Sequence, residues 1–187
     1  KHTDNLEAYD AFLRGRGYLY RHTKESHAQA RQMFEKAIAL DPQYAEACAF
    51  LGWTYWIEWG FRWSADPQIM ERALALAQQA LALDDSLPTA HSLLSIVYAQ
   101  KQQYDQALAE GERAVALDPN YADSYALQAE VLNFAGRPEE ALQSVEQAMR
   151  LNPRCPPGHL ALVGFAYRFT GRYAEAIATL KETISWS

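Results

Sequence analysis

The chain has 187 residues, of which 49% are hydrophobic and 21% are charged, an ordinary composition for a soluble folded protein. Its 17 basic and 23 acidic residues give a formal charge of −6, which argues against nucleic-acid binding because affinity for phosphates requires clustered Lys and Arg. No apolar run approaches the roughly 18 to 20 residues that cross a bilayer, and no secretory signal opens the chain, so we expect a cytoplasmic protein.

The residues that usually carry catalysis or bind metals form no motif. Cys48 and Cys155 lie far apart and have neither metal-ligand nor redox spacing, so we interpret both as small packing residues. The histidines make no His-x3-His or His-Glu-x2-His pattern, and no glycine-rich loop follows a predicted strand. We therefore expect a protein that is not an enzyme and that binds no metal or cofactor.

Four segments of the chain end in nearly the same way. Each is an alanine-rich apolar run that closes on Asp or Asn, and three of them continue with proline, which ends a helix because it crowds the preceding residue. Successive endings lie 43, 34 and 34 residues apart, so the second unit carries nine extra residues. The segments are residues 37–42, 80–85, 114–119 and 148–153.

Each unit also has a break near its middle, for example at residues 102–103, 136–138 and 171–172. Every unit is therefore predicted to be two helices joined by a short turn. Residues 26–29, Ser-His-Ala-Gln, predict a capping box that opens the second helix of the first unit. Asp66-Pro67 predicts the start of the second helix of the next unit. The predicted units are residues 10–44, 45–87, 88–121, 122–156 and 157–187.

Small residues recur at fixed places in these helices. Gly17, Gly52 and Gly164 lie in the predicted first helices, each three residues before a tyrosine (Tyr20, Tyr55 and Tyr167). A glycine inside a helix costs about 1 kcal/mol relative to alanine, so its recurrence predicts a close approach of another helix. Alanines seven residues apart recur in the second helices: Ala73 and Ala80, Ala107 and Ala114, Ala141 and Ala148.

This arrangement resembles the tetratricopeptide repeat, whose pattern is W-x2-L-G-x2-Y, then A-x3-F, then P. The second unit carries it as Leu51, Gly52 and Tyr55, and the match recurs in register along essentially the whole chain. The departures are the pattern's missing tryptophans and the nine extra residues. The resemblance implies an all-α fold, a right-handed α-solenoid that forms one domain over residues 1–187. In such a fold the first helices line a concave groove that binds a partner protein or peptide.

The register of the repeat assigns candidate groove residues, including aromatic and arginine side chains of the kind that dominate interface energetics. The alternative is that these side chains only pack between neighbouring helices. The subtype that clamps the carboxylate tails of chaperones is not expected, because the corresponding positions hold Trp53, Ile96 and Glu130. The candidates are Tyr18, Arg21, Trp53, Trp56, Ile96, Glu130, Phe134, Phe165, Arg168 and Phe169. The wider register of the fourth unit also places Asp123, Ala126 and Asn133 at groove positions.

Four of the five tryptophans lie between residues 53 and 63 and run into the extra residues of the second unit. The aromatic cluster of Trp59, Phe61 and Trp63 belongs to this tryptophan-rich insertion, residues 57–66. One interpretation is a small satellite core that folds the insertion back onto the repeats. The others are an exposed aromatic binding patch, which usually marks an interaction surface, or a pocket that senses a small ligand.

A finer resemblance concerns residues 3–16, 83–88 and 133–141. These segments are similar to the C-terminal repeat regions of bacterial signalling proteins, which often follow a class III adenylate or guanylate cyclase domain or a DNA-binding regulatory domain. The resemblance implies a regulatory or oligomerisation module of a larger signalling enzyme, with a homo-oligomer among the alternatives. The last helix, through Ile177 and Leu180, runs to Trp186 without a polar capping helix, so we expect a fragment of a longer chain.

Overall fold

The computed structural model describes residues 3–19, 21, 23–153 and 157–185, except for the side chains of residues 157–159 and 182–185. Tyr20, Cys155 and Trp186 lie outside the described residues. The described part of the chain forms helices and no strand, and none of its helices is long and apolar enough to cross a membrane. The helices are α1 (Leu6–Leu19), α2 (Lys24–Leu40), α3 (Ala45–Gly60), α4 (Ile69–Leu83), α5 (Pro88–Gln100), α6 (Tyr104–Leu117), α7 (Ala122–Phe134), α8 (Pro138–Leu151), α9 (Pro157–Phe169) and α10 (Tyr173–Ser185).

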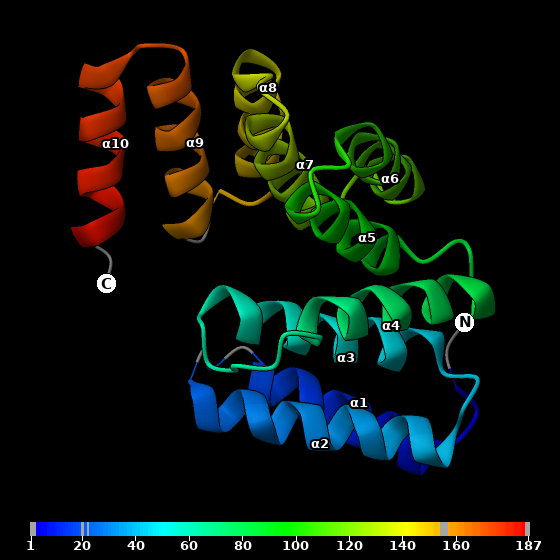
Figure 1. Ribbon diagram of the computed structural model, residues 1–187. Coiled ribbons are helices and arrows are strands. Elements are labelled where there is room, and N and C mark those ends of the chain that lie inside the picture. Colours follow the sequence, from blue (N-terminus) through cyan, green and yellow to red (C-terminus); the bar gives the residue numbers. More distant parts are fainter. Residues whose placement is uncertain (1–2, 20, 22, 154–156, 186–187) are drawn as a thin grey trace. The chain divides into compact units, whose positions relative to one another are not determined.

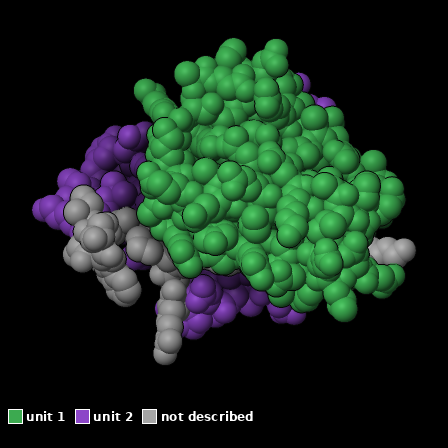
Figure 2. All heavy atoms as spheres, turned by 90° about the horizontal axis from the view of Figure 1, so that it is seen from below, with its two compact units in different colours: residues 1–97 green, residues 98–187 purple. Residues whose placement is uncertain are grey.

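The helices follow one another in the predicted pairs, which confirms the all-α class and the helix-turn-helix repeat (Figure 1). The most extensive packing joins α1 to α2, α3 to α4, α7 to α8 and α9 to α10. Further packing joins successive pairs, as between α2 and α3 and between α8 and α9. The chain divides into two compact units, residues 1–97 and 98–187, and each is described separately below (Figure 2).

Aromatic rings form the core of the first unit. Phe12 is buried, and its ring centre lies 5.0 Å from that of Tyr44, 5.3 Å from that of Phe50 and 5.8 Å from that of Phe34. Tilted and edge-on pairs at these distances are favourable beyond the area that they bury. Cys48 is also buried, and burial raises the pKa of its thiol to about 11, so it acts as the small packing residue that its spacing predicted.

The second unit has a smaller aliphatic core between α7, α8 and α9. Alanine and valine supply most of it, as expected where helices pack closely. Its buried residues are Ala129, Leu132, Ala141, Val145, Val163 and Ala166.

Four first helices end in the same backbone turn. Arg62, Gln102, Gly136 and Gly171 adopt positive φ angles of 55°, 61°, 73° and 75°. In each turn the following amide donates to the carbonyl five residues before it, as Arg137 does to Leu132 at 2.9 Å. This is the Schellman termination, which favours glycine because a side chain crowds the left-handed backbone.

The shared turn locates the nine extra residues of the second unit. Helix α3 has 16 residues, whereas α5, α7 and α9 have 13 each. Three of the extra residues therefore lengthen α3 by nearly one turn, five lie between its Schellman turn and α4, and one lengthens α4, which has 15 residues where α6 has 14.

Two helices begin at other residues than the sequence predicted. The capping box of α2 is formed by Thr23 and Ser26, with Ser26 N donating to Thr23 Oγ1 at 3.1 Å, so Ser26 is the inner member of the box and not the cap. Serine replaces the usual Glu or Gln at that inner position, which hid the box in the sequence. Helix α4 begins at Ile69, and Asp66 instead accepts from the backbone amide of Gln68 at 2.9 Å in the preceding turn.

Close helix approach explains two of the three predicted packing glycines. A methyl group on Gly52 would lie 2.5 Å from Leu93 Cδ2, and one on Gly164 would lie 2.6 Å from Leu180 Cγ. The prediction for Gly17 was wrong, because nothing lies within 4 Å of the same position there. Gly15 makes the close approach in the first repeat, at 2.6 Å from the Phe34 ring.

Candidate functional site

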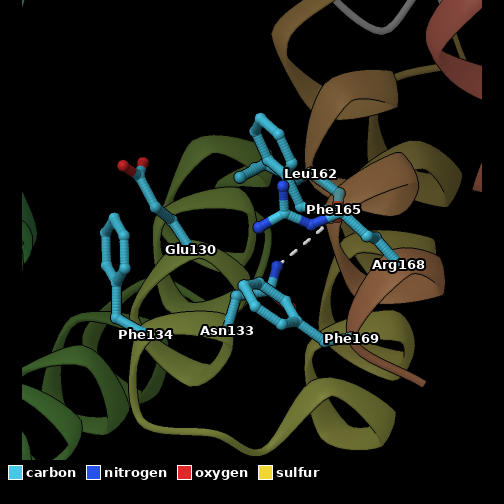
Figure 3. A pocket seen from close by; sticks show the side chains of 7 residues that line it. All are labelled: Glu130, Asn133, Phe134, Leu162, Phe165, Arg168 and Phe169. Carbon is cyan, nitrogen blue, oxygen red and sulfur yellow. Dashed lines mark hydrogen bonds between the residues drawn. The ribbon is translucent and has the colours of Figure 1, made fainter. Parts of the chain in front are cut away.

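A pocket of about 170 Å³ lies between α7 and α9, the first helices of the last two repeats, and both belong to the second unit. Figure 3 shows side chains from the two helices lining it. Residues three and four apart in a helix share one face, and the spacing within each set follows that rule. The lining residues are Glu130, Asn133 and Phe134 of α7 and Leu162, Phe165, Arg168 and Phe169 of α9.

Three phenylalanine rings give the pocket its apolar surface. Phe134, Phe165 and Phe169 are 44%, 42% and 53% exposed, although large apolar side chains are normally buried in a folded protein. A group of exposed apolar rings usually marks a surface that binds another molecule.

Asn133 connects the two helices at the pocket. Its side chain is buried, at 6% exposure, and its Nδ2 donates to the backbone carbonyl of Leu162 at 3.4 Å. The Oδ1 atom of the same amide is buried without any hydrogen-bond partner. A buried acceptor of this kind is rare in folded proteins, because water or a protein donor normally satisfies it.

Two opposite charges line the pocket without pairing. Glu130 is half-buried, and burial raises the pKa of its carboxyl group to about 7. The guanidinium carbon of Arg168 lies 5.0 Å from the centre of the Phe169 ring. Figure 3 shows the Glu130 carboxylate on the Phe134 side and the Arg168 guanidinium group reaching from α9 toward the middle of the pocket, and neither group forms an ion pair within the described residues.

The pocket brings together a large share of the residues that the repeat register nominated. Glu130, Asn133 and Phe134 come from one predicted groove helix, and Phe165, Arg168 and Phe169 from the next. Leu162 was not nominated, because it lies outside the groove register. Its position three residues before Phe165, on the same helical face, was the signal that pointed to it.

The tryptophan candidates of the first unit are more firmly packed. The Trp53 indole donates to the backbone carbonyl of Thr89 at 3.2 Å, and its ring meets that of Trp56 edge-on at 5.3 Å. Both side chains are half-buried, and the Trp56 indole nitrogen is buried without a partner. Ile96 is fully buried at 0% exposure, so its side chain presents no surface to a partner.

The candidates of the first repeat depended on the register of Gly17. The close approach is at Gly15 instead, so the groove position that follows the packing glycine is Arg16 and not Tyr18. The Arg16 guanidinium carbon lies 5.3 Å from the Phe50 ring centre. Tyr18 packs against the aromatic core, with the guanidinium carbon of Arg21 5.1 Å from its ring centre.

The tryptophan-rich insertion combines a packed part and an exposed part. The Trp63 ring lies 5.2 Å from that of His27, which is buried in α2, and Arg31 of α2 pairs with Glu58. These contacts fold the insertion against the first repeat, as the satellite-core interpretation predicted. Phe61 stacks on Trp63 at 4.7 Å but is 59% exposed, and Trp59 is 39% exposed.

Comparison with known proteins agrees with the repeat architecture. Family models described as tetratricopeptide repeat match residues 15–44 and 70–122, and the model of anaphase-promoting complex (cyclosome) subunit 3 matches residues 100–183. One curated relative, a protein called putative adenylate cyclase 3 of Rhizobium meliloti (strain 1021), is 34% identical over 100 residues. Those residues are 53% of this chain but only 17% of the relative.

Solved structures with the same fold cover nearly the whole chain. A thermophilic tetratricopeptide-repeat protein of Thermus thermophilus superposes with a TM-score of 0.75 at 22% identity, over 95% of this chain and 90% of that one. PilF of Pseudomonas aeruginosa gives 0.68 at 20% identity, over 95% and 77%. YrrB, described as a tetratricopeptide-repeat protein with an unusual peptide-binding site, gives 0.56 at 20% identity, over 97% and 88%. With its paired helices, its shared Schellman turns and these matches, the chain is built of tetratricopeptide repeats and has an all-α solenoid fold.

Proposed function

We propose that this chain is a non-catalytic scaffold that holds a partner polypeptide, and that the pocket between α7 and α9 is a principal contact. The observation that carries the proposal is the grouping of three half-exposed phenylalanine rings in one pocket. The fold supports it as well, since structural relatives include a protein described as having a peptide-binding site.

The chemistry of the pocket suits a peptide side chain. Completing the burial of Phe134, Phe165 and Phe169 would contribute about 1 kcal/mol for each ring, because burying a whole phenylalanine is worth about 1.5 to 3 kcal/mol.

Affinity capture with matched variants tests this proposal. The chain and a Phe134→Ala, Phe165→Ala double variant are used to capture proteins from source cells, and binding of each captured protein is then measured with purified components. Tyr173→Ala is the control, because Tyr173 is a 65% exposed aromatic residue of α10 outside the pocket. We expect the double variant to lose a protein that the control retains. Equal binding by all three proteins would contradict the assignment of the pocket.

A second candidate function is a regulatory module that acts on its own longer chain. The similarity to part of a putative adenylate cyclase favours it, because the matched residues form a small part of that relative. Here the pocket would bind a segment of the same protein or of a second copy. Cyclase activity of a full-length parent protein, with and without Phe134→Ala and Phe165→Ala, separates this candidate from a scaffold that binds a different protein.

A further inference from the structure

The polar groups of α7 that lack a partner at the pocket are hydrogen-bond acceptors. Asn133 Oδ1 is a buried acceptor without a donor, and the half-buried carboxyl group of Glu130 has no cation beside it within the described residues. The donors of Arg168 lie toward the face of Phe169. What the pocket lacks is therefore hydrogen-bond donors and positive charge on the side formed by α7.

The aromatic rings add to the same preference. The face of a phenylalanine ring carries negative electrostatic potential and attracts ammonium and guanidinium groups. Phe169 already has such a contact with Arg168, whereas no cation in the part of the chain that the structure describes lies over Phe134 or Phe165. These two rings lie in the same pocket as Glu130, which is four residues before Phe134 and therefore on the same face of α7 (Figure 3).

We propose that the pocket binds a basic and apolar partner segment, with a Lys or Arg stem against Phe134 and Phe165 and its cationic head beside Glu130. This inference rests on the scaffold function proposed above and specifies the class of partner. Long basic side chains suit such a site because their methylene stems bury well while the charged end reaches a carboxylate.

An acidic segment fits the pocket less well. Its carboxylate could pair with Arg168, but it would face the carboxyl group of Glu130. The net charge of −6 on the chain also attracts a basic partner over longer distances. The raised pKa of Glu130 agrees with a basic partner. Burial disfavours the charged carboxylate, and an approaching cation would stabilise it.

Three capped nonapeptides provide the probe: Gly-Ser-Lys-Leu-Lys-Leu-Lys-Ser-Gly and its counterparts with glutamate or glutamine in place of every lysine. Binding is measured by calorimetry at pH 8, where Glu130 is largely ionised. The protein variants are Glu130→Gln, Arg168→Gln and Phe134→Ala with Phe165→Ala. Glu139→Gln is the matched control, because Glu139 is an exposed carboxylate on α8 outside the pocket.

We expect the lysine peptide to bind at least about tenfold more tightly than the glutamate peptide. Glu130→Gln should weaken the lysine peptide about tenfold, whereas Glu139→Gln should not, and Arg168→Gln should leave its affinity unchanged or raise it. Tighter binding of the glutamate peptide, lost in the double phenylalanine variant, would overturn the basic partner but keep the scaffold. Equal binding of all peptides, or no effect of Glu130→Gln, would also overturn the basic partner. If no peptide binds, both proposals fail at this pocket.

Discussion

Asn133 donates its side-chain amide to the backbone carbonyl of Leu162 across 3.4 Å and so bridges α7 and α9, while its own Oδ1 remains unpaired. At 3.4 Å this hydrogen bond is long, and the cost of burying the unpaired oxygen offsets part of its contribution to the free energy of unfolding. We therefore expect Asn133, which also lines the pocket, to contribute little to stability.

Asn133→Ala should accordingly separate these two roles. We expect the free energy of unfolding, measured by urea denaturation, to change by less than about 1 kcal/mol, because one weak hydrogen bond and one unsatisfied acceptor are lost together. Affinity for a peptide in the pocket should fall severalfold. A large loss of stability with unchanged affinity would show that Asn133 is a structural link only.

The Schellman turn after α5 is strained at one residue. Gln102 has a φ of 61°, in the left-handed region where Gly136 and Gly171 stand in the equivalent turns. Gln102→Gly should raise the free energy of unfolding by about 0.5 to 1 kcal/mol, because a left-handed conformation costs a residue with a side chain roughly 1 to 2 kcal/mol and the flexibility of glycine offsets part of the gain. Gln103→Gly is the control, since Gln103 has a φ of −92° and should only lose stability.

Two glycines of α1 should respond to alanine in opposite directions. Gly15→Ala should destabilise the fold by about 1 to 3 kcal/mol, because the new methyl group would meet the buried ring of Phe34 at 2.6 Å. Gly17→Ala should stabilise it by about 0.5 to 1 kcal/mol, because the added group meets nothing and alanine favours the helix. Thermal denaturation followed by circular dichroism measures both variants. Similar effects of the two would contradict the assigned register.

Glu130 should make the stability depend on pH. Burial raises the pKa of its carboxyl group from 4.5 to about 7, so between these values the folded state binds more protons than the unfolded state. Its contribution to stability is therefore fully present below about pH 4.5 and is lost as the pH rises through about 7. Arg168 of α9 is the charged residue of another helix that lines the same pocket, and it forms no ion pair with Glu130.

The measurement is the midpoint of thermal unfolding at pH 5 and pH 8 for the chain and for Glu130→Gln. Other titrating groups affect both proteins equally, so the difference between them isolates Glu130. We expect the advantage of the variant to be larger at pH 8. An equal difference at the two pH values would show that the carboxyl group is not buried in solution.

The helix pairs were predictable because their signals are local. Proline after Asp or Asn ends the second helices, and glycine after Phe134-Ala135 and Thr170 marks the left-handed turns of the last two repeats. The repeat register then predicted that Glu130, Phe134 and Phe165 lie on the groove side of their helices, since each of these positions depends only on helical periodicity.

Other features depend on atoms that are distant in the sequence, and only the tertiary structure decided them. Whether Gly15 or Gly17 is the packing glycine depends on the Phe34 ring, which reaches α1 from another helix. The complete burial of Ile96, inside a helix whose sequence predicted a groove position, was likewise not readable from periodicity. The unpaired oxygen of Asn133 exists because α7 and α9 pack closely enough to exclude other donors from it. Local sequence determines where helices begin and end, whereas close packing between helices determines which side chains remain exposed and unsatisfied at the pocket.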